Sequence, residues 1–273
     1  MSMLKVNYHF KLLPKFILKR FTRIEPPYIG VVFLGVLYLV ARNYVPSAAQ
    51  IDLTPSFRDV MLHLGYLVPF VEDAKWVNPV FWTLSVEFQY YLFLAITFPL
   101  VLSKVSYLRF LFYFLVLVIP FLGLGGQSFY SNWSAYFGLG IFYVLYITKR
   151  IDILEFMLIT VLASIAVYFV QGLLDLCIGL CTLGVVHFFR SFTTKIGEFF
   201  GKISYSVYLL HSIVGAAFIN YMSHIYRVPY QKALVIIGGL VVTILMSYIY
   251  WKIIERPSQK WSNKIKLDNS KGK

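Results

Sequence analysis

The chain has 273 residues, of which 59% are hydrophobic, 19% are aromatic and only 14% are charged. Soluble domains carry about a quarter charged residues, so this composition excludes an ordinary soluble domain and indicates a polytopic membrane protein. A net charge of +13 would suggest a nucleic-acid partner in a soluble protein. Here the basic residues lie in short segments between apolar runs, where Lys and Arg set topology, so we expect the lipid bilayer as partner and no nucleic acid.

The cysteines and the N-terminal sequence exclude two further classes. Cys177 and Cys181 lie in one apolar run without the additional ligands that a zinc site or a disulfide framework requires, so we expect no metal. The first 27 residues are basic and interrupted by polar positions, which is unlike a cleavable signal peptide.

The apolar runs predict the fold class. A segment must be about 20 residues long to cross roughly 30 Å of hydrocarbon at 1.5 Å per residue. The sequence therefore predicts an all-α polytopic membrane helix bundle with about eight transmembrane helices. Only Gln171 and Gly172 separate the fifth and sixth, which predicts a tight hairpin. The predicted spans are residues 28–44, 80–103, 107–123, 131–147, 153–170, 172–189, 202–222 and 231–254.

The basic residues between these spans predict an orientation. Lys and Arg accumulate on the cytoplasmic side, and successive spans must alternate in direction. With the N-terminus inside, all but five of the 25 Lys and Arg residues fall in cytoplasmic segments, and both termini are cytoplasmic. The five external residues are Arg42, Arg58, Lys75, Arg227 and Lys232.

One long external segment, residues 45–79, follows the first span. Its middle, residues 60–71, is apolar but too short to cross the membrane, so we interpret it as interfacial or re-entrant. We expect a single transmembrane domain over residues 1–260. A polar, lysine-rich and disordered tail is expected over residues 261–273.

Glu87 is the carboxylate that lies well within an apolar span, about 10 Å along the helix from its external end. A charge at such depth costs about 2.5–3.5 kcal/mol on insertion scales, so it normally faces the bundle interior or a wet cavity. Hydrogen bonding between helices is the structural alternative to a catalytic role. Polar neighbours on the same or adjoining helix faces are candidates to line a substrate site: Trp82, Thr83, Ser85, Gln89 and Tyr91.

His211 lies midway through the seventh predicted span, in "KISYSVYLLHSIVGAAF". Ser204, Tyr208 and Gly215 follow the same helical spacing, so Ser204 and Tyr208 are further substrate-lining candidates. His211 is interpreted either as a hydrogen-bonded packing residue or as a catalytic group. The other histidines lie outside the spans or at a span end, and point to no chemistry: His9, His63, His187 and His224.

The segment "FILKRFTRIEPPYI" places Lys19, Arg20 and Arg23 immediately before the first predicted span. The simple interpretation is topological anchoring. Two arginines three residues apart on one helical face, followed by a Pro-Pro break, would also bind phosphate oxygens well. The pattern alone leaves both interpretations open.

The C-terminal "IIERPSQKW" places Glu255 and Arg256 on the same predicted membrane side as Arg20 and Arg23. This arrangement predicts either an ion-pair network or solvated charges at a helix end.

Together these segments resemble the membrane-bound acyltransferase 3 family. "WTLSVEFQYY" is similar to the family signature, in which Trp, Ser or Thr, Leu, two residues, Glu, two residues and an aromatic pair open a span. "RFTRIEPPY" resembles the family's Arg-x-x-Arg segment with its following Ile-x-Pro, and "GKISYSVYLLHSIV" and "IERP" resemble its two C-terminal landmarks. The four occur in the family's order and cover residues 16–257.

The resemblance implies an integral membrane enzyme of the bacterial cytoplasmic (inner) membrane. It would transfer an acyl group, commonly acetyl, from cytoplasmic acyl-coenzyme A to a hydroxyl of an envelope carbohydrate or a lipid-linked glycan. Acyl-coenzyme A would be a donor substrate, and no permanently bound cofactor is expected. Arg20 and Arg23 match the family's arginine pair and would hold the phosphates of coenzyme A. Glu87 matches the family's Glu, and it and His211 are the catalytic candidates.

The resemblance has a gap at the N-terminus. The family usually has ten spans, and the first carries a basic residue, ten intervening residues and a His with a catalytic role. Residues 1–15 contain no such pair. We therefore expect a shortened member that lacks the usual first two spans. The alternatives are a misassigned start, a disrupted gene or a real short form. A partner polypeptide that supplies the missing helices is a further option, and whether the chain is active alone stays open.

Three other hypotheses stay open. A transporter or flippase-like bundle would line a permeation path with Glu87 and His211, but it predicts internal repeats or broken helices in matched halves, and the sequence shows neither. A non-catalytic remnant would do no chemistry. An unrelated membrane O-acyltransferase would use His211 as its base and tolerate the loss of Glu87.

Overall fold

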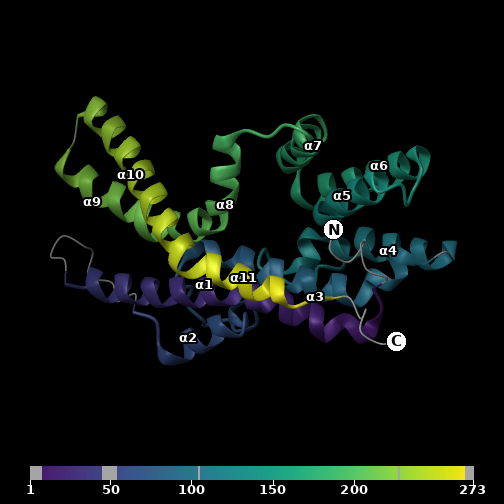
Figure 1. The fold of residues 1–273 in the computed structure, drawn as a ribbon, viewed down its shortest axis with the longest axis horizontal. Helices are drawn as coiled ribbons and strands as arrows, with labels where there is room; N and C mark the ends of the chain where they lie inside the picture. Colours follow the sequence, from purple (N-terminus) through teal and green to yellow (C-terminus); the bar gives the residue numbers. More distant parts are fainter. Residues whose placement is uncertain (1–7, 45–53, 104, 227, 268–273) are drawn as a thin grey trace. The chain divides into compact units, whose positions relative to one another are not determined.

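The structure, a computed structural model, describes residues 8–44, 54–103, 105–226 and 228–267. Every regular element in these ranges is a helix (Figure 1). The chain forms two compact units. Unit 1 comprises Met1–Pro14, Thr83–Phe192 and Ser270–Lys273, and unit 2 comprises Lys15–Trp82 and Thr193–Asn269.

Unit 1 is built around a hydrophobic core that α4, α5 and α6 share, with Phe112, Leu139, Phe142 and Ala163 fully or almost fully buried. The tight hairpin predicted at Gly172 is confirmed, because α6 ends and α7 begins on either side of it and its φ of 96° favours glycine. The helices of this unit are α3 (Trp82–Leu102, from Thr83), α4 (Ser106–Val118), the 3₁₀ turn η4 (Ile119–Leu122), α5 (Tyr130–Ile147), α6 (Ile153–Gln171) and α7 (Leu173–Phe189).

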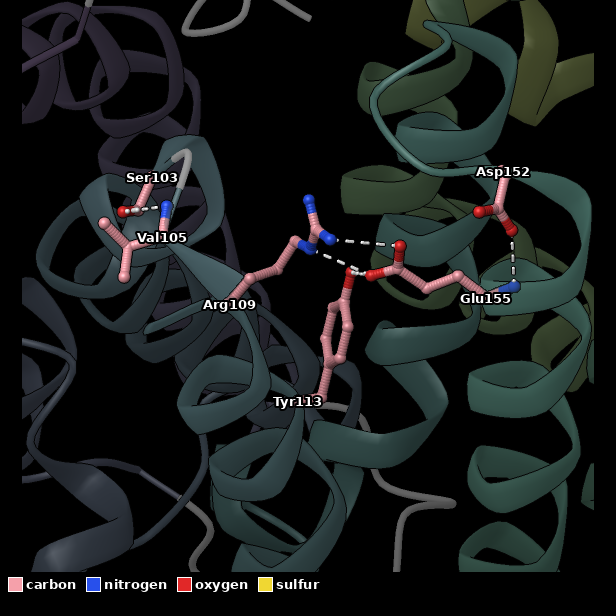
Figure 2. Close-up of polar contacts among 6 residues, drawn as sticks. All are labelled: Ser103, Val105, Arg109, Tyr113, Asp152 and Glu155. Carbon is pink, nitrogen blue, oxygen red and sulfur yellow. Dashed lines mark hydrogen bonds and ion pairs between the residues drawn. The ribbon is translucent and has the colours of Figure 1, made fainter. Parts of the chain in front are cut away.

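An ion pair joins α4 to the first turn of α6 in unit 1 (Figure 2). Arg109 binds both carboxylate oxygens of Glu155, with Nε 2.8 Å from Oε1 and Nη2 3.2 Å from Oε2. The Tyr113 hydroxyl donates to Oε1 at 2.8 Å, and Asp152 caps the helix by accepting the Glu155 N–H at 2.8 Å. An ion pair that includes a hydrogen bond from Nη2 fixes geometry as well as charge, so it helps to set how α4 lies against α6.

Unit 2 has α1 as its longest helix, and the C-terminal α11 lies beside the N-terminal half of α1 (Figure 1). Lys19 Nζ donates to the Ile265 carbonyl at 3.1 Å, and the Ser262 hydroxyl donates to the Lys19 carbonyl at 2.7 Å. The turn η1 (Phe10–Leu12) and the first two residues of α1 belong to unit 1. The elements of unit 2 are the rest of α1 (Leu13–Arg42), α2 (Phe57–Leu64), η2 (Val68–Phe70), η3 (Pro79–Phe81), α8 (Lys195–Leu210), η5 (His211–Ala216), α9 (Ala217–Ile225), α10 (Pro229–Tyr250), η6 (Trp251–Glu255) and α11 (Arg256–Lys264).

The predicted break at the Pro-Pro pair is wrong, since α1 continues through Pro26 and Pro27. Neither proline supplies an N–H, so two carbonyls of the preceding turn lose their usual donors. These are the carbonyls of Thr22 and Arg23. Two other carbonyls of the same stretch accept from neighbouring helices. Tyr205 of α8 donates to the Ile24 carbonyl at 3.2 Å, and Tyr250 of α10 donates to the Pro27 carbonyl at 2.5 Å.

Among the described residues, five helical stretches are long and apolar enough to cross a membrane, which supports a membrane protein. Two shorter apolar stretches lie at Ser106–Leu122 and Leu173–Phe189, so the count of eight stays a prediction, as does the side on which the termini lie. Helix α11 continues to Lys264, into the predicted tail. Lys104, Arg227 and the ranges 1–7, 45–53 and 268–273 lie outside the described residues. The five stretches are Phe10–Arg42, Pro79–Leu102, Ile153–Gln171, Lys195–Ile225 and Pro229–Lys264.

The segment between α1 and α3 folds back along α1 within unit 2. It begins beside the end of α1, where Asn43 Nδ2 donates to Thr54 Oγ1 at 2.8 Å. At Tyr66 it has reached Tyr28, and the two rings stack with centroids 4.9 Å apart. Phe81, just before α3, still lies against Tyr28 at 5.1 Å. The segment therefore packs along α1 within unit 2, and its interfacial or re-entrant placement stays a prediction.

His63 holds this segment together from inside. Its side chain is 0% exposed, and it accepts the Val77 N–H on Nε2 at 3.1 Å. Nδ1 therefore carries the proton and donates to the Asp59 carbonyl at 2.7 Å. Burial lowers the pKa of His63, because the charged imidazolium would be poorly solvated.

Asp59 forms a capping box with Ser56 at the start of α2. Its second carboxylate oxygen accepts the Lys75 N–H at 3.2 Å, which ties α2 to the return of the segment. Burial would raise the pKa of Asp59, but the hydrogen bonds from Ser56 and Lys75 outweigh it, so the pKa lies below its ordinary value.

Candidate functional site

Glu87 contacts its own helix in unit 1. The Tyr91 hydroxyl donates a short hydrogen bond to Glu87 Oε1 one turn along α3. Glu87 is half-buried, so the carboxylate retains oxygen lone pairs for a further donor. The shared helix face expected from the sequence is therefore present for this pair.

Gln89 has a structural task in unit 1. Its Nε2 donates to the Ser128 carbonyl at 3.1 Å, and its Oε1 accepts the Tyr130 N–H at 2.9 Å. The Tyr130 N–H is one of the first in α5 and has no partner within that helix. Gln89 thus caps α5 and fixes the loop before it, which is a different use of the side chain from the substrate contact expected from the sequence.

The remaining candidates at the start of α3 differ in burial. Ser85 is buried, and its hydroxyl has no hydrogen-bond partner within the part of the chain that the structure describes. Thr83 is half-buried in unit 1, and Trp82 is half-buried in unit 2.

His211 opens a π-helical turn in unit 2, where α8 gives way to η5. Its side chain is exposed, and Nδ1 lies 2.6 Å from the Tyr208 carbonyl. A carbonyl oxygen only accepts, so Nδ1 carries the proton and Nε2 of the neutral ring is left as the basic nitrogen. Single π turns inside α-helices occur frequently at functional sites. The geometry therefore suits a general base.

The π turn is tied to the segment that leads into α3. Ser212 donates to Asn78 Oδ1 at 2.8 Å, and the Tyr208 hydroxyl donates to the Val80 carbonyl at 2.8 Å. Tyr208 is thus committed through both its carbonyl and its hydroxyl. Ser204 is exposed and donates to the Gly201 carbonyl of its own helix at 3.1 Å.

Glu255 lies in a second π-helical turn of unit 2, and only 3% of the residue is exposed. Its Oε2 accepts both the N–H and the hydroxyl of Ser206, and its Oε1 accepts Gln259 Nε2 at 2.7 Å. Arg23 acts on this carboxylate through a favourable Coulombic interaction. Arg256 instead places its guanidinium 5.6 Å from the Trp251 ring centroid.

The arginine pair lies on α1 in unit 2. Arg23 is exposed, and Arg20 is half-buried with its guanidinium 5.5 Å from the Phe16 ring centroid. Lys19 is used structurally against α11. Among the three basic residues of this stretch, Arg23 is thus the most accessible to an anionic ligand.

The structure divides the predicted site residues between the two units. Unit 1 holds Thr83, Ser85, Glu87, Gln89 and Tyr91, and unit 2 holds Arg20, Arg23, Trp82, Ser204, Tyr208 and His211. Within the described residues, no group of three or more His, Cys, Asp or Glu side chains could hold a metal ion.

Sequence reasoning missed the burial of two carboxylates. Glu25 and Glu255 are each 3% exposed and lie inside continuous helices, so Glu87 is not the only carboxylate deep in a long helical stretch. The predicted spans begin after Glu25 and end before Glu255, and only the continuity of α1 and of α10–η6–α11 reveals their setting. Ser206 and Tyr66 were missed, and His63 was assigned no role, because their partners are distant in sequence.

The apolar helical stretches indicate an integral membrane protein, and its described residues include two π-helical turns. A family model described as an acyltransferase domain matches residues 2–252. The chain therefore belongs to the acyltransferase 3 family, and its class is membrane acyltransferase. Three of the four quoted landmarks fall within the match, whereas "IERP" follows its last residue. No curated protein and no solved structure matches the chain.

Proposed function

We propose that this protein is a membrane O-acyltransferase that moves an acyl group, acetyl in the first instance, from acyl-coenzyme A to a carbohydrate hydroxyl. The acceptor is a cell-envelope carbohydrate or a lipid-linked glycan, and the enzyme acts in the bacterial inner membrane. The family supplies the reaction type. The observation that carries the proposal is the exposed His211, whose Nδ1 is held by the Tyr208 carbonyl so that Nε2 is free to accept a proton.

The chemistry is an acyl exchange that balances without a further reactant. His211 Nε2 takes the proton of the acceptor hydroxyl, and the oxygen attacks the thioester carbonyl carbon. The tetrahedral intermediate collapses, the C–S bond breaks and the C–O bond of the ester remains. The imidazolium then returns its proton to the departing thiolate, so the products are the acyl ester and free coenzyme A.

The arginines suit the donor in this scheme. Coenzyme A carries phosphates, and a guanidinium binds phosphate oxygens through paired N–H donors. Arg23 is exposed and Arg20 lies one helical turn before it. In unit 1, Glu87 is proposed to orient a hydroxyl of the acceptor through the carboxylate oxygen atoms that Tyr91 leaves unoccupied.

Membranes that contain the protein test the proposal directly. Transfer of label from acyl-coenzyme A to envelope glycan should fall about 100-fold or more in His211→Ala, the loss expected for a general base. Arg23→Ala should raise the KM for the donor about tenfold, which corresponds to about 1.4 kcal/mol of binding. Matched controls are His224→Ala and Arg150→Ala, both at exposed positions. Unchanged transfer in His211→Ala would refute the assigned base.

A further inference from the structure

The segment of residues 54–81 meets α1 at a buried carboxylate. The Tyr66 hydroxyl donates a hydrogen bond to Glu25, and both residues are buried, at 5% and 3% exposure. Tyr66 also stacks on Tyr28, with an interplanar angle of 12°. Burial, followed by the Glu25 charge, raises the pKa of Tyr66 far above its ordinary range, so the phenol is a permanent donor. Two separate contacts therefore fix one side chain against α1.

The backbone of Tyr66 adopts a conformation that disfavours tyrosine. Tyr66 has a φ of 55°, in the left-handed region that glycine occupies at no steric cost. Its position is the one after the C-cap of α2, where the Leu67 N–H bonds back to the Leu62 carbonyl at 2.8 Å. Glycine is the usual residue at this position of such a motif, and the neighbouring Gly65 has a φ of −95°. A tyrosine held in a conformation that disfavours it is held by its side-chain contacts.

The contact between Tyr66 and Glu25 lies close to the arginines of α1. Glu25 precedes Arg42, the end of the helix, by 17 residues, which is about 26 Å at 1.5 Å per residue. It follows Arg23 by two residues. Phe81 packs on Tyr28, and Trp82, the next residue, is the first of α3. The start of the "WTLSVEFQYY" helix is thus placed beside the α1 turn that follows the donor arginines.

We propose that Tyr66 is a positioning residue. Through Glu25 it holds the segment of residues 54–81 against α1, so that the start of α3 lies beside the α1 turn that follows the donor-binding arginines. This inference rests on the proposed acyl transfer for its functional half. Trp82, the first residue of α3, is then held in unit 2 beside the α1 turn that follows the arginines. The packing of the segment against α1 is a structural property and is measured without any activity.

A disulfide cross-link measures whether the segment of residues 54–81 packs against α1. A Cβ at Gly35 would lie 2.6 Å from Cγ1 of Val77, so Gly35→Cys with Val77→Cys places two thiols within disulfide range when the segment packs there. Cys177 and Cys181, both exposed, are replaced by Ser in the background. Tyr66→Phe keeps the ring and removes only the hydrogen bond. Glu25→Gln keeps an acceptor, and Tyr44→Phe at an exposed tyrosine is the matched control.

The expected result is a rate of cross-linking at least tenfold lower in Tyr66→Phe, near the parent value in Glu25→Gln, and unchanged in Tyr44→Phe. In the parent without the added cysteines, Tyr66→Phe should lower kcat at least tenfold while the binding of a non-reactive thioether analogue of acyl-coenzyme A changes less than twofold. Glu25→Leu serves as a second variant with the same expectation, should Tyr66→Phe fold poorly.

Cross-linking of Tyr66→Phe and Glu25→Leu at the parent rate would overturn the role of the pair in holding the segment against α1. Slower cross-linking with unchanged kcat would overturn the positioning role in catalysis. If the parent protein transfers no acyl group at all, the proposed function fails, whereas the cross-linking rates still decide whether the pair holds the segment. The two failures are therefore told apart.

Discussion

Ser206 donates both its backbone N–H and its hydroxyl to the same carboxylate oxygen of Glu255. The two residues lie 49 positions apart, on α8 and on the π turn η6, and both are buried. The pair therefore joins two of the chain's long helices inside unit 2. Loss of a donor to this buried carboxylate should destabilise the fold, because leaving a buried charge unpaired costs more free energy than the pairing contributes.

Ser206→Ala should destabilise unit 2 by about 1.5–3 kcal/mol, the range for a hydrogen bond to a charged group. Thermal unfolding of the detergent-solubilised protein, followed by the loss of monodisperse protein, measures the change. Ser204→Ala is the matched control, since its exposed hydroxyl bonds only within its own helix. Equal unfolding temperatures for the two variants would show that the Ser206 hydroxyl contributes nothing.

The ion pair between Arg109 and Glu155 should show coupling in a double-mutant cycle. Arg109→Met and Glu155→Gln each remove the two-point contact, so the double variant should lose less stability than the two single losses combined, with a coupling of about 1–2 kcal/mol. Arg150→Met, at an exposed arginine, supplies the control. Strict additivity of the two substitutions would contradict the contact drawn in Figure 2.

Gln89→Leu should loosen the loop between η4 and α5. The substitution removes one hydrogen bond to Ser128 and one to Tyr130, which is about 2 kcal/mol at about 1 kcal/mol each. Hydrogen exchange over residues 123–131 should rise, whereas Gln127→Leu, at an exposed glutamine, should leave it near the parent value. No change in exchange for Gln89→Leu would refute the capping role.

The segment 54–81 should open as the pH falls. The pKa of His63 is lowered in the closed segment and ordinary, about 6.5, in the open one. The open form therefore takes up a proton first, so the stability of the closed segment is full above about pH 6.5 and is lost as the pH falls toward the pKa of the closed form. Asp59 adds a further loss only at lower pH, below about 4, since its pKa is also lowered.

Limited proteolysis of this segment at pH 7.5 and pH 5.5 measures the effect. Cleavage should increase at the lower pH in the parent protein and in His224→Ala. His63→Gln has no titrating ring, so its cleavage should not change between the two values. A parent protein with the same cleavage at both values would contradict the assigned state of His63.

Much of the fold follows from the sequence, because hydrophobic length and periodicity are local properties. The all-helical architecture of the described residues and the hairpin at Gly172 were predicted correctly. The number of spans and the site roles of Tyr208 and His211 stay predictions. The signature stripe of α3 gave a mixed result. Glu87 does contact Tyr91, whereas Gln89 serves the backbone of a loop that no local pattern connects to it.

The rest depends on contacts between distant segments. The Pro-Pro pair predicts a break, yet α1 continues through it, and Tyr205 and Tyr250 donate to nearby carbonyls of that stretch. Tyr66 lies where glycine is locally favoured, and its side chain contacts Glu25 and Tyr28. At Tyr66, contacts between distant segments override the local preference.

The most direct test of the acyltransferase account uses sealed inside-out membrane vesicles supplied with labelled acetyl-coenzyme A on the cytoplasmic face. Vesicles with the parent protein should incorporate label into envelope glycan as an alkali-labile ester, and vesicles with His211→Ala should incorporate about 100-fold less. Incorporation by the parent protein no higher than in vesicles that lack it would contradict the account.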